Sequence, residues 1–163
     1  MMDTMTTNKT INIEDLSTEI IVNIFRDGMR DAADDENEPL TDPKSDQRPD
    51  NTEFIMTSFP QTRVFYPLII IDEFDDSDER VDAQVDFFRH SYALRITIYA
   101  ESNTHLYHIR DQVRHFIESN YVANMDAGFH ETSIQSSTAA TWEVNAEVQK
   151  WEMIVSGMVF TKT

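Results

Sequence analysis

The 163-residue chain has no cysteine and only three glycines. Without cysteine it can form no disulfide bond, no cysteine-ligated zinc or iron–sulfur centre and no thiol nucleophile. Three glycines leave no glycine-rich loop for phosphate binding. No apolar run approaches the roughly 18 residues of a membrane span, and Met1–Lys9 lacks the basic and apolar segments of a secretory signal. We therefore expect no membrane association, and a protein that acts inside a cell or in a particle assembled there.

Positive charge is also scarce. Thirty acidic residues against 13 basic ones give a net charge of −17 and a pI near 4.4, and only four of the basic residues are lysines. Self-repulsion at this charge destabilises a compact fold at moderate salt, whereas near 1 M salt the Debye length shrinks to about 3 Å. An aspartate-rich, lysine-poor chain is typical of a halophile's cytoplasm, and an acidic protein of an ordinary cell is the alternative. The absence of a basic stripe argues against binding of DNA through its phosphates.

Enough apolar residues remain for a core, because Leu, Ile, Val and Phe make up about a quarter of the chain. Two segments carry them at the spacing of an amphipathic helix: Ile13 to about Asp31, and Ser102 or Asn103 to about Tyr121. The expected buried positions of the two helices are Leu16, Ile20, Ile21, Ile24 and Phe25, and Leu106, Ile109, Val113, Phe116 and Ile117.

The remaining apolar segments favour β-strands. They are Phe54–Phe59, Arg63–Asp72, Val85–Ala100, Thr132–Ser136 and Thr141–Thr161. The longest regular one alternates with a period of two and is long enough to project past the core. One of its faces carries Phe88, His90, Tyr92, Leu94, Ile96 and Ile98, and the other Arg89, Ser91, Ala93, Arg95, Thr97 and Tyr99. A one-residue slip of the alternation near Gln149 and Lys150 predicts a bulge or a break into two strands.

The order of these elements is α-β-β-β-α-β-β. It predicts a two-layer α+β domain, in which two helices pack on one face of a mainly antiparallel sheet. We expect a single domain at 13–163 after a flexible N-terminal arm at 1–12. Two acidic segments, an insertion loop at 31–51 and a connection at 72–82, are expected to lie outside the domain core, with at least one ordered against another chain. A solvated acidic loop without a role is the alternative.

No group of residues points to catalysis. His105, His108 and His115 share the second helix, but the pair of histidines four apart with an intervening glutamate that a zinc helix needs is absent. The acidic run at 72–82 has oxygen ligands for a divalent cation, yet it lacks the glycine and the spacing of an EF-hand loop. We therefore expect surface histidines, a salt-adapted acidic segment, no metal, no cofactor and no enzymatic activity.

The order of features resembles the tail terminator, or tail completion, family of long-tailed viruses and the related tail-to-head joining proteins. The resemblance covers about residues 14–162. It rests on the helices Leu16–Arg30 and Leu106–Arg114 and on the strands Phe65–Ile71, Leu94–Ala100 and Trp151–Phe160. Shorter members lack the insertion at 31–51, so the resemblance assigns no role to it.

Membership would imply a structural virion protein assembled in the host cytoplasm, and the acidic, lysine-poor composition favours a halophilic archaeal host. The family forms a homo-hexameric ring that caps the tail tube, binds the tail tube protein and offers a surface to the neck and connector proteins. Genomic DNA would pass through the lumen without specific binding. Another head–tail connector, such as a neck or head-completion protein, and a cellular halophilic binding module are the alternatives.

The scarce arginines of the long strand are the first candidates for contacts between acidic subunits, and the acidic segments are the next. The candidate partner interface therefore comprises Arg89, Arg95, Tyr99, Asp34, Asp35, Asp75 and Asp76.

Overall fold

The computed structural model describes residues 18–34, 40–82, 87–119, 129–140 and 147–162. Side chains are described within 21–33, 40–74, 91–118, 132–140 and 147–158. The expected N-terminal arm at 1–12 lies outside the described residues. The elements are α1 (Thr18–Asp34), the 3-10 turn η2 (Ser45–Gln47), β1 (Ile55–Met56), β2 (Leu68–Asp82), β3 (Phe87–Ala100), α2 (Asn103–Ser119), β4 (Phe129–Ala140) and β5 (Gln149–Lys162).

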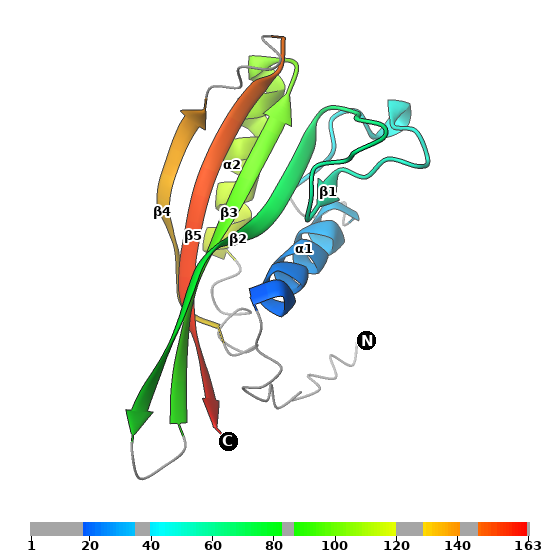
Figure 1. The fold of residues 1–163 in the computed structure, drawn as a ribbon. Coiled ribbons are helices and arrows are strands. Elements are labelled where there is room, and N and C mark those ends of the chain that lie inside the picture. Colours follow the sequence, from blue (N-terminus) through cyan, green and yellow to red (C-terminus); the bar gives the residue numbers. More distant parts are fainter. Residues whose placement is uncertain (1–17, 35–39, 83–86, 120–128, 141–146, 163) are drawn as a thin grey trace, which may run out of the picture.

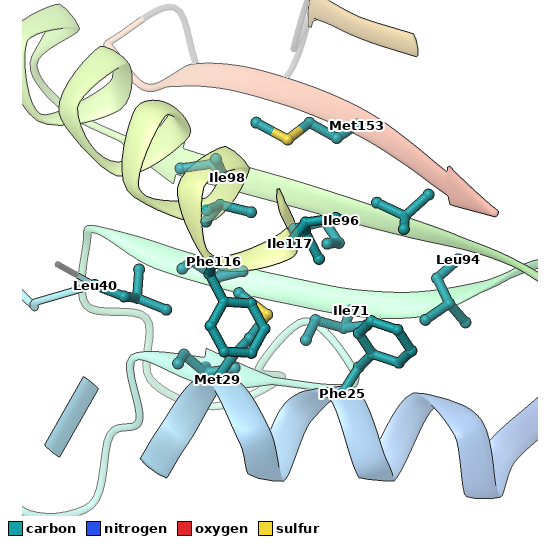
Figure 2. Close-up of a cluster of buried hydrophobic side chains, with 14 of the residues drawn as sticks. Phe25, Met29, Leu40, Ile71, Leu94, Ile96, Ile98, Phe116, Ile117 and Met153 are labelled. Atoms are coloured by element: carbon teal, nitrogen blue, oxygen red, sulfur yellow. The ribbon is translucent and has the colours of Figure 1, made fainter. Parts of the chain in front are cut away.

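The strands form one open sheet in the order β1-β2-β3-β5-β4 (Figure 1). β1 runs parallel to β2, and every other neighbouring pair is antiparallel. Side chains of α1 and α2 meet the same face of β3 in one hydrophobic core (Figure 2). The two-layer α+β fold and the element order predicted from the sequence are therefore confirmed.

The helices follow their apolar spacing. All five apolar positions expected for α2 are buried, and Ser102 caps this helix by accepting a hydrogen bond from the His105 backbone N–H at 3.2 Å. In α1 the core face comprises Ile21, Val22, Phe25, Met29 and Ala32. Ile24 was expected on that face, but it is 37% exposed because the helix turns it away from the sheet. Leu16 and the side chain of Ile20 lie outside the described residues.

The alternation expected for the long strand is confirmed in β3. Tyr92, Leu94, Ile96 and Ile98 are buried in the core. Their neighbours in β5 are Gly157, Val155, Met153 and Trp151. The slip of the alternation near Gln149 marks the start of β5, and β4 ends at Ala140; residues 141–146 lie outside the described residues.

The expected acidic connection at 72–82 is wrong, because this segment is the second half of β2. It pairs with β3 through two register shifts, between Glu73 and Asp75 and between Arg80 and Asp82. Beyond the core, β2, β3 and the end of β5 continue as a narrow projection that neither helix covers (Figure 1). A strand without a covering layer needs no apolar face, so an acidic sequence can form it.

The expected exposed insertion at 31–51 is partly wrong where the structure describes it: the side chains at 41–51 are exposed or half-buried, as expected, but the segment packs against its own chain. α1 continues to Asp34, and Leu40 is fully buried in the core. The Arg48 side chain is 9% exposed and forms an ion pair with Asp42 at 2.6 Å. It also donates to the carbonyls of Phe65 and Pro67 and lies 4.9 Å from the centre of the Phe65 ring. One arginine therefore fastens this segment to the residues just before β2, because its planar donors reach several acceptors at once.

Other strand boundaries differ from the expected ones. β1 contains only two residues, and β2 begins directly after the cis peptide bond between Tyr66 and Pro67. β4 is longer than the expected strand at 132–136.

Candidate interaction surface

The face of the sheet opposite both helices is the best candidate for a functional surface. We call it the open face. Alternation and register place on it Ile70, Asp72, Arg95, Thr97, Tyr99, Glu152 and Ile154. Neither helix covers these residues, since α1 and α2 pack on the other face.

An ion pair lies at the centre of the open face. Arg95 and Asp72 stand directly opposite each other on β3 and β2. The guanidinium donates two hydrogen bonds to the carboxylate, the one from Nε to Oδ1 at 3.1 Å. These bonds, with the charges of Asp72 and Glu152, raise the pKa of Arg95, against the opposing effect of its partial burial. A paired arginine whose side chain stays 38% exposed keeps a charged group available to a partner.

Aromatic side chains flank the ion pair. The rings of Tyr99 and Phe59 meet edge to face, with centroids 5.3 Å apart. The Lys150 ammonium lies 5.9 Å from the centre of the Tyr99 ring. Burial raises the pKa of Tyr99, and the negative charge of Asp72 raises it further. Aromatic and arginine side chains are enriched where proteins bind each other, so this combination is typical of a protein contact.

Apolar residues support the same face. Leu68 and Ile70 are buried there, as is the polar Thr97, while Phe59 remains 36% exposed. Buried side chains beside the charged and aromatic groups restrict the motion of those groups, which lowers the entropy cost of binding a partner.

The structure brings together two of the seven expected interface residues. Arg95 and Tyr99 lie on the open face, where Arg95 pairs with Asp72 of the same chain. Arg89 is separated from Arg95 by an even number of positions in β3, so alternation puts it on the same face. It stands opposite Glu79 and Phe160, but its side chain lies outside the described part.

The other four residues are not joined to this surface by any described contact. Asp34 ends α1, on the helix side of the sheet, and Asp35 lies outside the described residues. Asp75 and Asp76 belong to β2 and stand opposite Ala93 and Tyr92. Their side chains are likewise outside the described part.

Sequence reasoning missed Asp72, Glu152 and Phe59 as members of the surface. Asp72 ends the expected strand Arg63–Asp72 and begins the expected acidic connection, whereas in the structure β2 continues through it. The pairing of Asp72 with Arg95 depends on the register of two strands. A period of two shows which residues share a face but not which residue of the next strand stands opposite.

The expected surface histidines are exposed at His108 and His115, and His105 is partly buried. Nε2 of His108 lies 2.9 Å from Nε2 of Gln112. Among the residues whose placement is described, no three His, Asp or Glu side chains gather to hold a metal ion. No helix in the described ranges is long and apolar enough to cross a membrane.

We compared the chain with known proteins. No protein family model matches this chain, and no curated protein has a similar sequence.

Proposed function

We propose that this protein is a tail terminator, a structural virion protein that forms a ring on the end of a viral tail tube and joins it to the neck. The observation that carries the proposal is the open face, a rigid sheet surface with an arginine–carboxylate pair and aromatic groups that no helix covers. Such a surface suits contact with another protein. The fold also has the order of elements on which the resemblance to this family rests.

The charge of the chain supports the same function. Each of the six copies in a ring would contribute a net charge of −17. A ring with a lumen of that sign would repel the phosphates of DNA, so a genome would pass through without binding. An open sheet with two edges also provides the means to join copies, since closing a ring removes unpaired strand edges.

Light scattering and negative-stain imaging of the purified protein test this function. In about 2 M KCl, where the Debye length is only about 2 Å and repulsion between copies is screened, we expect a closed ring of six copies. A monodisperse monomer across the accessible concentrations would contradict the proposal and favour a cellular binding module.

The arginines of β3 give a sharper test of the open face. We expect the double variant Arg89→Ala, Arg95→Ala to lose assembly while it stays folded, because the partly exposed pair of Arg95 with Asp72 contributes only about 0–1 kcal/mol to stability. The control is Arg26→Ala with Arg114→Ala, which removes the same charge from the two helices. Equal assembly of both double variants would exclude the open face as a subunit contact.

A further inference from the structure

The edge of the sheet formed by β4 lacks the usual protection against pairing. β4 hydrogen-bonds to β5 on one side, and no strand among the described residues lies on its other side (Figure 1). No charged residue occurs between Glu131 and Glu143, the longest such interval in this highly charged chain. Natural proteins usually protect an edge strand with charges, proline or a bulge that turns it away. β4 has register shifts between His130 and Ser133 and between Ile134 and Ser136, but the part from Ser136 to Ala140 is regular and uncharged.

The side chains of this edge are accessible. Five of them are exposed: Ser133, Gln135, Ser136, Thr138 and Ala139. They belong to both faces of β4, although α2 packs against the strand where Ile134 meets the core. An approaching strand would meet small, uncharged groups and an unpaired backbone, which is the surface that strand addition uses.

The opposite edge of the sheet has the reverse character. β1 covers β2 only at Ile69 and Ile70. From Glu73 to Asp82, β2 pairs with β3 and has no described strand on its other side. That segment contains six acidic residues: Glu73, Asp75, Asp76, Asp78, Glu79 and Asp82. Two copies cannot join through this edge alone, because like charges opposite each other destabilise a strand pair.

We propose that the β4 edge of one copy pairs with the acidic edge of β2 in a second copy. The uncharged strand lets the acidic strand approach without carboxylate facing carboxylate, and backbone hydrogen bonds then form between them. This contact uses a different surface on each partner, and repetition of such a contact closes a ring when the rotation from one copy to the next divides a full turn. The inference rests on the proposed function, since it identifies a second contact between subunits of that ring, in addition to the open face.

Charge substitutions of opposite sign on β4 test the pairing. Ser133 and Ser136 are suitable because both are exposed and stand opposite the uncharged Ser156 and Ile154 of β5. We expect Ser133→Glu with Ser136→Glu to raise the protein concentration at which half of the assembly dissociates by about tenfold. Ser133→Lys with Ser136→Lys should leave that concentration unchanged or lower it, because the added ammonium groups face an acidic strand. Sedimentation velocity at the lowest KCl concentration that keeps the chain folded measures both.

Two further variants separate this contact from a general effect of net charge. Gln47 and Asn51 are exposed and lie in the segment before β1, outside β4 and outside the acidic part of β2. Glu or Lys at both positions should therefore leave assembly unchanged. In the Ser133→Glu, Ser136→Glu background, Asp76→Lys with Asp78→Lys should restore assembly, because the charge pattern of the two edges is then reversed. Circular dichroism checks that every variant is folded.

Each other outcome overturns one proposal or both. If the glutamate and lysine substitutions on β4 weaken assembly equally, β4 pairs with the β4 strand of a second copy and the inference is wrong. If a ring forms and neither substitution affects it, the inference fails while the proposed function stands. If the assembly responds as expected but is not a ring, the edge contact stands and the terminator function fails. A monomeric wild-type protein contradicts both.

Discussion

Gly157 of β5 stands directly opposite Tyr92 of β3, and the tyrosine ring occupies the space where any other residue would place its side chain. A Cβ atom at position 157 would lie 2.7 Å from Cζ of that ring. The absence of a side chain at Gly157 thus lets a large aromatic residue lie flat across the sheet. There its ring contacts Phe25 of α1, with centroids 5.9 Å apart, and its hydroxyl meets Thr132 of β4 at 2.9 Å.

Gly157→Ala should destabilise the fold by about 1–3 kcal/mol, the usual cost of inserting a group into a packed core. Chemical denaturation measures the change, and Ser156→Ala on the other face of the same strand is the control. The cost should largely disappear in a Tyr92→Leu background, where the shorter side chain vacates the space. An equal cost in both backgrounds would show that the ring is not the obstacle.

Tyr92 should also make stability depend on alkaline pH. Burial raises the pKa of Tyr92 from 10.0 to about 12, and its hydrogen bond to Thr132 opposes part of that rise. Below pH 10 the hydroxyl is protonated in both folded and unfolded chains, so stability is unaffected. Between pH 10 and 12 only the unfolded chain loses the proton, and the free energy of unfolding falls by about 3 kcal/mol in total.

Tyrosinate absorbance against pH, with parallel denaturation, tests this dependence. Tyr92→Phe should remove the contribution of Tyr92 to the fall in the free energy of unfolding between pH 10 and 12. At neutral pH it should lower that free energy by about 1 kcal/mol, because Thr132 loses its hydrogen-bond partner. Tyr107→Phe, on a ring that is 45% exposed, is the control. An identical alkaline profile for wild type and Tyr92→Phe would contradict the assignment.

The segment after α1 should prove essential for folding. Leu40→Ala should cost about 2–5 kcal/mol, since a fully buried leucine leaves a cavity. Arg48→Ala should cost about 3–5 kcal/mol, because it leaves Asp42 nearly buried without its partner. Deletion of residues 34–46 should therefore unfold the domain, whereas an insertion outside the core would be dispensable.

Thermal unfolding followed by circular dichroism compares these variants. Lys44→Ala is the matched control: its ion pair with Glu101, at 3.6 Å, is partly exposed and should be worth less than about 1 kcal/mol. Similar losses for Lys44→Ala and Arg48→Ala would show that Arg48 has no special place in the fold.

Stability should rise with salt. At a net charge of −17, repulsion among carboxylates opposes the compact state, and mobile ions screen this repulsion. We expect the midpoint of thermal unfolding to increase between about 0.1 and 3 M KCl. Most of the increase should occur below 1 M, because at 1 M the Debye length has already fallen to about 3 Å. The same series in sucrose, which stabilises folds without screening charge, is the control. A flat KCl profile would exclude salt adaptation.

Several features of the fold follow from local patterns alone. Leu106, Ile109 and Val113 recur at helical spacing, and α2 buries all three. The alternation from Tyr92 to Ile98 likewise places the core face of β3. These patterns suffice because the side-chain period of a helix or strand is a property of the backbone, so one buried face requires one spacing of apolar residues.

Other features depend on neighbours that the local sequence does not specify. The acidic second half of β2 has no apolar face, and it is a strand because β3 continues beside it. The polar segment around Arg48 is fixed by acceptors at Asp42 and Pro67 that precede and follow it. Tertiary structure alone also decided the pairing of Arg95 with Asp72, since strand register places a residue opposite its partner and no period within one strand encodes that register.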